Sequence, residues 1–350
     1  MKKNIHKRVV LGVLLSFGGL MVLPSTGHAA DSQGGGEAVV INPGGGRLAD
    51  GSDGIASVFN GAEDLGNGTA TVSNTGSDQI FYANTPQWCC GGGGLVLAIG
   101  GSAYGEAGAA SNESLPSFDS IAVTAVSGSA RKINNGVADN SIQALTNTGD
   151  GSATIKYEIT HGGRLYRVTR VVSYVYPDKY YSESYSVTIP SGNTDPVKLY
   201  YGGDAAPGGE DSAYGKFYDV NGRRFFLSLE PNSGIYLGFV ETPGNEFDRY
   251  FVGDYEAPYE IIAAGQDLPN TVDETPDTDI GVQIQWNFGS TPGTYTRSMT
   301  GVSGFVADVD SDVNSLPATG MNLNLALAGL ATGMLGAIVF AASRSTRRFA

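Results

Sequence analysis

Alternation of apolar and polar residues runs through several stretches of this chain. It is clearest at residues 153–159, 165–171, 181–189 and 281–288, where β-branched and aromatic residues recur at every second position. Successive side chains of a strand point to opposite faces of a sheet, so this period predicts half-buried β-strands. No sustained period of 3.6 residues occurs between residues 31 and 315. We therefore predict an all-β protein with many antiparallel strands.

Turn-forming residues separate these stretches. His161-Gly162-Gly163 follows the first stretch, and Pro177-Asp178-Lys179 follows the second. Glycine, proline and aspartate favour turns, so two successive hairpins are expected. His161 is also the single histidine left outside the first 30 residues, which argues against a histidine-rich zinc site and against most catalytic triads.

The length of the middle region favours one domain. We predict a large antiparallel β-sandwich over residues 31–305, with a glycine-rich first half and a more regular second half. Residues 31–50 are expected to be loose, and residues 100–117 to form a long surface loop, because both are rich in glycine. The predicted size is similar to that of the large sandwiches of sugar-binding and mutarotase-like domains, an analogy that concerns the fold alone.

Residues 1–30 have the layout of a secretory signal peptide. A basic head at residues 2–8 precedes an apolar run at residues 9–23, and small residues follow up to Ala30. The apolar run is shorter than the roughly 20 residues that a membrane span needs. We therefore expect a signal helix that is removed after Ala29 or Ala30.

The other end of the chain carries a second apolar segment. Residues 321–342 contain no charge, and the basic tail at residues 343–350 contains three arginines. A segment of this length can span a bilayer, and an arginine cluster stays on the cytoplasmic side. A C-terminal transmembrane helix is therefore expected, with the precursor transiently in the membrane.

Leu316-Pro317-Ala318-Thr319-Gly320 stands directly before this apolar segment. The order of pentapeptide, span and basic tail resembles the LPxTG sorting signals of Gram-positive surface proteins. This resemblance implies that a sortase cleaves between Thr319 and Gly320 and joins Thr319 to peptidoglycan. The protein would then be extracellular and anchored in the cell wall, with residues 306–315 as a short acidic linker. The alternative is a plain membrane anchor that contains the pentapeptide by chance.

Charge excludes one class of partner. The two ends hold seven of the 21 basic residues and none of the 35 acidic ones, which leaves a net charge of about −21 for residues 31–319. Such a surface repels phosphates, so nucleic acid is not expected as a partner. It attracts cations, including calcium, but acidic surfaces also serve simply to keep an extracellular domain dispersed. We therefore expect no cofactor, with calcium as the alternative.

The first candidate site is Trp88-Cys89-Cys90, which precedes four glycines and contains both cysteines of the chain. A disulfide is the expected state outside the cell, and a bond between neighbours closes a small strained ring. With Trp88 it would form a flat knob on which a ligand could stack. Two free thiols and a bond to another chain are the alternatives.

The second candidate site begins at Tyr200 and Tyr201, where a strand is expected to end. A loop with Asp204, Glu210 and Asp211 follows. Its oxygens could hold calcium, its aromatic and acidic groups could hold a sugar, or its carboxylates could act as in glycosidases. Acidic clusters also arise by chance in a chain with 35 acids, and a solvated loop is the alternative.

These features favour a surface protein that binds carbohydrate or host matrix without catalysis. The main rival is a carbohydrate-active surface enzyme that uses Asp204, Glu210 or Asp211. A structural component of the cell wall is the third alternative.

Overall fold

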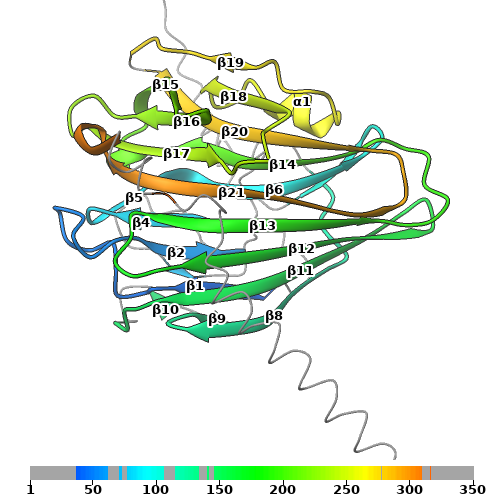
Figure 1. Ribbon diagram of the computed structural model, residues 1–350, viewed down its shortest axis with the longest axis horizontal. Coiled ribbons are helices and arrows are strands. Elements are labelled where there is room, and N and C mark those ends of the chain that lie inside the picture. The colour runs from blue at the N-terminus through cyan, green and yellow to red at the C-terminus, as the bar shows by residue number, and fades with distance from the viewer. Residues whose placement is uncertain are drawn as a thin grey trace, which may run out of the picture.

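The computed structural model describes residues 37–61, 71–72, 77–105, 115–133, 140–141, 146–276, 278–309 and 316. Antiparallel strands dominate these residues, which confirms the predicted all-β class (Figure 1). The expected signal helix and transmembrane helix lie outside them. Across the described parts of the chain, no helix has the length and apolar character that crossing a membrane requires.

The strands form a front sheet and a back sheet that are joined at one edge, together with a smaller sheet. The front sheet runs in the order β8 (Ser120–Gly128), β11 (Gly151–His161), β12 (Arg164–Tyr174), β13 (Tyr180–Ile189), β21 (Gly293–Phe305), β17 (Ile235–Glu241), β16 (Arg223–Leu229) and β15 (Ser212–Val220). The back sheet runs in the order β7 (Ser102–Gly105), β6 (Trp88–Ile99), β14 (Val197–Ala205) and β20 (Thr278–Gly289), with β18 (Arg249–Asp254) on β20 and β19 (Thr271–Val272) on β18. Pairing of β15 with β20 joins the two sheets.

The smaller sheet runs in the order β5 (Thr85–Pro86), β4 (Gln79–Tyr82), β2 (Ala56–Phe59), β1 (Ala38–Ile41) and β9 (Arg131–Ile133). A separate pair consists of β3 (Thr71–Val72) and β10 (Asn140–Ser141). The helical elements are α1 (Tyr259–Ala263) and the short 3-10 turns η2 (Pro207–Gly209) and η3 (Val306–Asp308).

The alternating stretches are strands as predicted. They lie within β11, β12, β13 and β20, and the two expected turns connect β11 to β12 and β12 to β13. The period of two sets their packing, because one face of each strand is apolar and lies against the opposite layer of the sandwich. In β20, for example, Ile280, Val282, Ile284 and Trp286 all belong to the main core.

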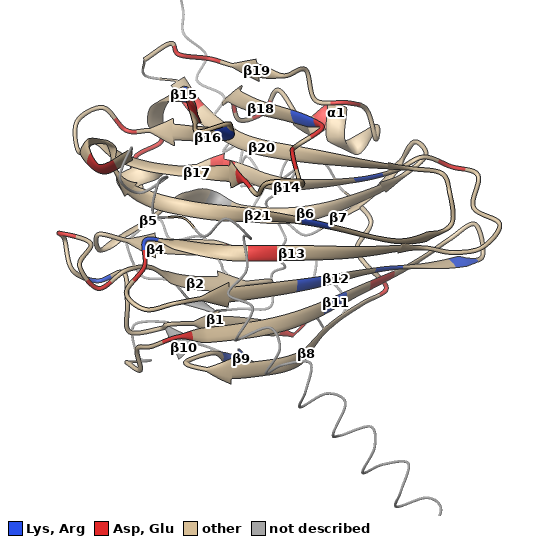
Figure 2. Ribbon diagram, viewed as in Figure 1, with Lys and Arg blue, Asp and Glu red and all other residues tan. Residues whose placement is uncertain are grey.

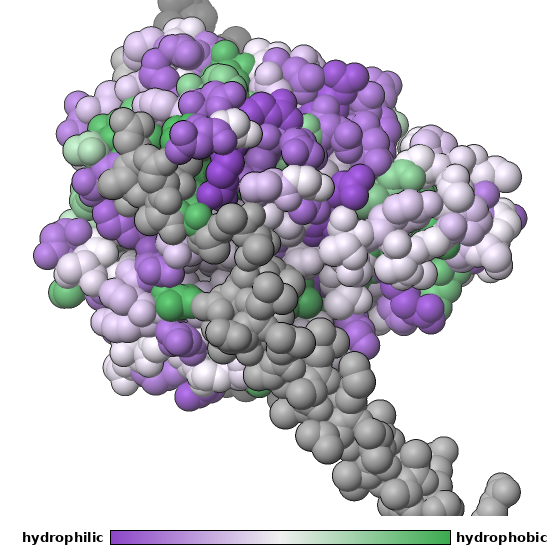
Figure 3. Space-filling view, in the orientation of Figure 1, coloured by the Kyte–Doolittle hydropathy of each residue, from purple (hydrophilic) through white to green (hydrophobic). Residues whose placement is uncertain are grey.

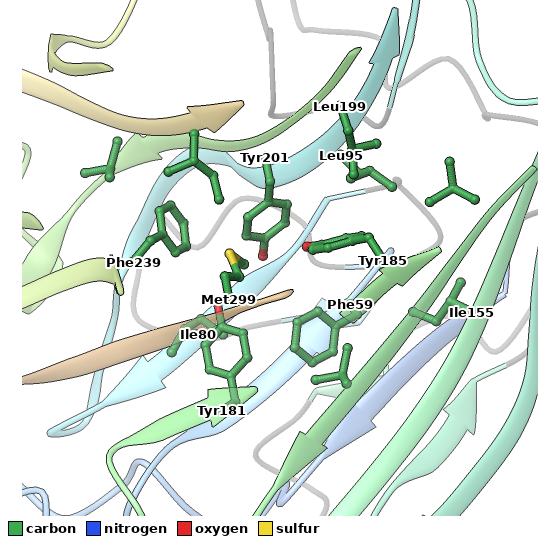
Figure 4. Packing of buried hydrophobic residues seen from close by; sticks show 14 of the residues in the cluster. Phe59, Ile80, Leu95, Ile155, Tyr181, Tyr185, Leu199, Tyr201, Phe239 and Met299 are labelled. Carbon is green, nitrogen blue, oxygen red and sulfur yellow. The ribbon is translucent and has the colours of Figure 1, made fainter. Parts of the chain in front are cut away.

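The main core fills the space between the front sheet and the two sheets behind it. Figure 4 shows Tyr181 and Tyr185 of β13 and Tyr201 of β14 pointing into it, beside Phe239 of β17 and Met299 of β21. All five side chains are buried. Aromatic residues from both layers therefore hold the sandwich together by their large buried areas and edge contacts.

Within this core lies a buried ionic cluster around Arg170 of β12. Its guanidinium donates to Asp78 Oδ2 at 2.6 Å, to Glu183 Oε2 at 2.7 Å and to the Tyr201 hydroxyl at 3.0 Å. The central guanidinium carbon, Cζ of Arg170, also lies 4.6 Å from the ring centroid of Phe59. Burial alone would lower the pKa of Arg170, but Asp78 and Glu183 raise it well above its usual value, so this residue stays charged.

Two glycine-rich stretches differ from expectation. Residues 31–50, expected to be loose, contain β1, whose four residues are fully buried. Residues 100–117, expected to be a surface loop, contain β7 paired with β6, while residues 106–114 of this stretch lie outside the described ones. The glycines of these stretches form turns and allow close backbone contacts. Gly46, for example, has a φ of 69°, which a residue with a side chain rarely adopts.

Candidate functional site

Trp88 lies in the core and not on a surface knob. Its side chain is 1% exposed, and its ring lies 6.0 Å from the ring of Phe239, centroid to centroid. Its backbone is held by Gln79, whose side chain bonds both the N–H and the carbonyl of Trp88. The expectation that this indole offers a stacking surface to a ligand is therefore wrong.

The stretch that begins at Trp88 is strand β6, not the predicted knob. Gly93 and Gly94 pair with Gly203 and Gly202 of β14. An added Cβ at Gly93 would lie 2.9 Å from the ring of Trp88, so the glycine makes room for the buried indole. Cys89 is half-buried and disulfide-bonded, and the chain contains one other cysteine. The glycine run thus reflects core packing, while a vicinal disulfide remains a prediction.

The two tyrosines are also buried, and β14 does not end at them. Tyr201 points into the main core, where its hydroxyl donates to Asp78 at 2.9 Å. Tyr200 points to the opposite face, where its hydroxyl donates to the carbonyl of Gln266 at 2.6 Å. Both side chains are fully buried, so neither is available to a ligand as predicted.

Asp204 also belongs to β14, and it lies on the outer face of the back sheet. Its residue is 5% exposed, and its Oδ1 has no hydrogen-bond partner among the described residues. It stands opposite Gly281 of β20, and Asp279 lies two residues away on the same face of that strand. A buried carboxyl with an unpartnered oxygen is costly, which marks this position for explanation.

Backbone pairing brings further carboxylates to the same place. Ser212, next to Asp211, pairs with Asp279, and Asp254 at the end of β18 pairs with Ile280. The following turn is held by the N–H of Tyr255, which donates to the carbonyl of Asp279 at 3.1 Å. These groups form what we call the acidic edge: Asp204, Asp211, Asp254, Tyr255, Glu256 and Asp279. Figure 2 shows acidic residues in the segments around α1 and β19, at this end of the molecule.

Gly281 lets the aromatic member of the acidic edge come close. An added Cβ at Gly281 would lie 3.1 Å from the Cα of Tyr255, so any other residue would push the turn away. The half-buried ring of Tyr255 makes an edge contact with Tyr259 of α1, at 5.9 Å between centroids. Its hydroxyl donates to Glu256 at 2.9 Å. An aromatic ring and several carboxylates thus share one surface.

The carboxyl groups of the acidic edge differ in their pKa values. Burial, followed by the charges of Asp279, Asp211 and Glu256, raises the pKa of Asp204 from 3.8 to about 8. Burial, followed by Asp211, Asp254 and Glu256, raises the pKa of Asp279 to about 6. At neutral pH the edge therefore combines a protonated carboxyl, which can donate a hydrogen bond, with ionised neighbours that accept.

The structure unites only part of the second predicted site. Asp204 and Asp211 lie together, whereas Glu210 is exposed and is not among the groups that raise the pKa of Asp204. The sequence analysis did not assign Asp279, Tyr255 and Glu256 to this site. Asp279 is the last residue of an acidic run at residues 273–279, and only strand pairing shows that it faces Asp204.

No metal centre is formed by the described residues, because no group of three or more His, Cys, Asp or Glu side chains there is placed to hold an ion. Calcium therefore remains a prediction from net charge and from the acidic loop that follows Tyr201.

Comparisons with known proteins place the chain in no family. No family model matches it, and no curated protein matches it significantly. Among solved structures, a bacterial glucoamylase complexed with acarbose is similar at 11% identity and a TM-score of 0.47, over 79% of this chain and 34% of the glucoamylase. A TPR-domain containing protein from Parabacteroides distasonis is similar at 7% identity and a TM-score of 0.38, over 77% of this chain and 48% of that protein. The chain thus spans less than half the length of either.

Proposed function

We propose that this chain is a wall-anchored surface protein whose β-sandwich binds carbohydrate at the acidic edge. The observation that carries the ligand class is Asp204, a buried carboxyl with an unpartnered oxygen among exposed carboxylates and beside Tyr255. Sugar hydroxyls both donate and accept hydrogen bonds, and a sugar ring packs on an aromatic face. A neutral, hydroxyl-rich ligand matches these groups, whereas phosphate would be repelled.

The binding test uses the full chain displayed on cells and a glycan array, with and without calcium. Asp204→Ala removes both the proton that this carboxyl can donate and the oxygens that can accept a hydrogen bond. We expect a specific glycan signal that falls at least tenfold in this variant. Glu260→Ala, an exposed carboxylate on neighbouring α1, is the matched control and should bind like the wild type. If both variants bind equally well, the carbohydrate site does not lie at the acidic edge.

Anchoring is tested separately. The sorting signal supports cleavage at Thr319, so Thr319→Ala should release the protein into the medium or membrane fraction. If this variant stays covalently attached to purified peptidoglycan, the sortase part of the proposal fails while the binding part stands.

A second candidate function, glycoside hydrolysis, is favoured by the unequal pKa values of Asp204 and Asp279. One protonated and one ionised carboxyl are the groups that such enzymes use as acid and base. We rank it second because hydrolysis requires the two carboxyls to flank a glycosidic bond, whereas binding requires only that they contact sugar hydroxyls. The test is whether the wild type releases reducing sugar from the glycans that it binds. If it does, and if Asp204→Asn does not, hydrolysis becomes the first candidate.

A further inference from the structure

The outer face of the front sheet is apolar at β16, β17 and β21. Buried residues gather there in a second cluster, which consists of Phe225, Leu227, Leu229, Tyr236, Val240, Val302, Val309 and Leu316. Figure 3 views this side of the molecule. Where described atoms are visible, apolar residues form small separate patches among polar ones. The last two members of the cluster come from beyond the sheet and help to cover it.

The segment after β21 is held on this face by several contacts. The N–H of Val306 donates to the carbonyl of Gly234 at 2.7 Å, and Lys179 Nζ lies 2.9 Å from Asp308 Oδ2. Val309 is then 3% exposed. The predicted acidic linker at residues 306–315 therefore begins on the sheet: Val306 and Ala307 are exposed, but Val309 is buried in the apolar cluster. Residues 310–315 lie outside the described ones.

Leu316 is held by both its side chain and its backbone. The residue is 5% exposed within the apolar cluster, and its carbonyl accepts a hydrogen bond from Arg223 Nη1 at 3.2 Å. Arg223 is half-buried, and its Nη2 has no hydrogen-bond partner among the described residues. Burial lowers the pKa of Arg223, as expected for a guanidinium that the chain shields from water.

Leu316 is also the first residue of the predicted sorting motif. A cleft that takes up the whole pentapeptide takes up Leu316 as its first residue, and this leucine cannot occupy the cleft and its own domain at once. We propose, resting on the anchoring function proposed above, that the folded domain restrains its sorting signal through Leu316. Release of Leu316 from the apolar cluster then precedes cleavage between Thr319 and Gly320.

The size of the restraint follows from the burial. Burying one leucine side chain shifts an equilibrium roughly ten- to a hundredfold. The apparent affinity of an enzyme for a segment is its intrinsic affinity multiplied by the fraction of time that the segment is free. Cleavage of the folded chain should therefore be slower than that of the free segment by roughly the same factor.

The experiment measures kcat/KM of a purified sortase on the detergent-solubilised full chain and on a synthetic peptide of residues 313–324. We expect the peptide to be cleaved roughly ten- to a hundredfold faster. Arg223→Ala removes the hydrogen bond to the Leu316 carbonyl, so it should speed cleavage of the full chain several-fold. Arg224→Ala is the matched control, because Arg224 instead binds Glu241 and the carbonyl of Phe247.

The outcomes separate this inference from the anchoring proposal. Equal rates for chain and peptide, or an unchanged rate in Arg223→Ala, overturn the restraint and leave sorting intact. Faster cleavage in Arg224→Ala than in Arg223→Ala also overturns it, since general loosening of the domain would then explain the effect. Failure to cleave either substrate overturns both proposals.

Discussion

At the scale of single residues, Asp204 stands out because it is buried without a partner that would stabilise it. It accepts no hydrogen bond at Oδ1, and the neighbouring charges are of the same sign. Contrast Asp78, which is equally buried but bonds Arg170, Tyr201 and the N–H of Asn60. Structural carboxylates are paired in this manner, so an unpartnered one at a surface edge is better explained by a ligand.

The proton on Asp204 gives stability a defined pH dependence. Its pKa is about 8 in the folded protein and near 3.8 when exposed, so the folded state holds a proton that the unfolded state releases. Stability from this group is full below pH 4 and is lost as pH rises towards 8. The total is about 6 kcal/mol at most, at about 1.4 kcal/mol for each pH unit between the two pKa values.

Thermal unfolding at pH 5 and pH 8 checks this prediction. The wild type should lose several degrees in Tm between the two, and Asp204→Asn should lose clearly less, because an amide does not ionise. Asp279 adds a smaller loss in the same direction, with its pKa of about 6. An identical pH response in wild type and variant would show that Asp204 ionises normally.

At the scale of elements, glycines within strands serve packing and not flexibility. Gly301 of β21 stands directly opposite Tyr181 of β13, and an added Cβ would overlap the buried tyrosine ring. Gly93 makes the same kind of room for Trp88 in β6. A small residue opposite a large ring lets neighbouring strands keep their spacing while the ring fills the core.

Gly301→Ala should therefore cost about 1–3 kcal/mol in the free energy of unfolding, because the Tyr181 ring must shift inside a packed core. Gly101→Ala is the control, since nothing lies within 4 Å of an added Cβ there. Its effect should stay within about 0.5 kcal/mol. Urea denaturation measures both, and a loss in Gly301→Ala no larger than in the control would refute the packing argument.

At the scale of the whole molecule, the Arg170 cluster connects all three sheets. Arg170 and Glu183 come from the front sheet and Tyr201 from the back sheet. Asp78 precedes β4 of the smaller sheet, and its backbone also bridges Gly93 of β6. The cluster thus fixes how the layers meet, and its charges are buried where water cannot replace a missing partner.

Arg170→Met should destabilise the protein by about 3–5 kcal/mol, because Asp78 and Glu183 would stay buried without their cation. Arg167→Met, three residues along the same strand, is the matched control. Arg167 binds Glu158 at 2.7 Å on the exposed face, so its loss should cost about 0–1 kcal/mol. Equal losses in urea denaturation would mean that the cluster is energetically unimportant.

The sequence by itself determined the strands whose two faces differ, since alternation in β11, β12, β13 and β20 records which side chains meet the core. It could not show that Trp88, Tyr200 and Tyr201 are buried. The local sequence of an aromatic residue beside glycines is the same whether the side chain faces solvent or fills a core. Nor could it join Asp204 to Asp279, which are 75 residues apart. Only strand pairing sets that distance, because register is decided by how whole sheets bury their apolar faces.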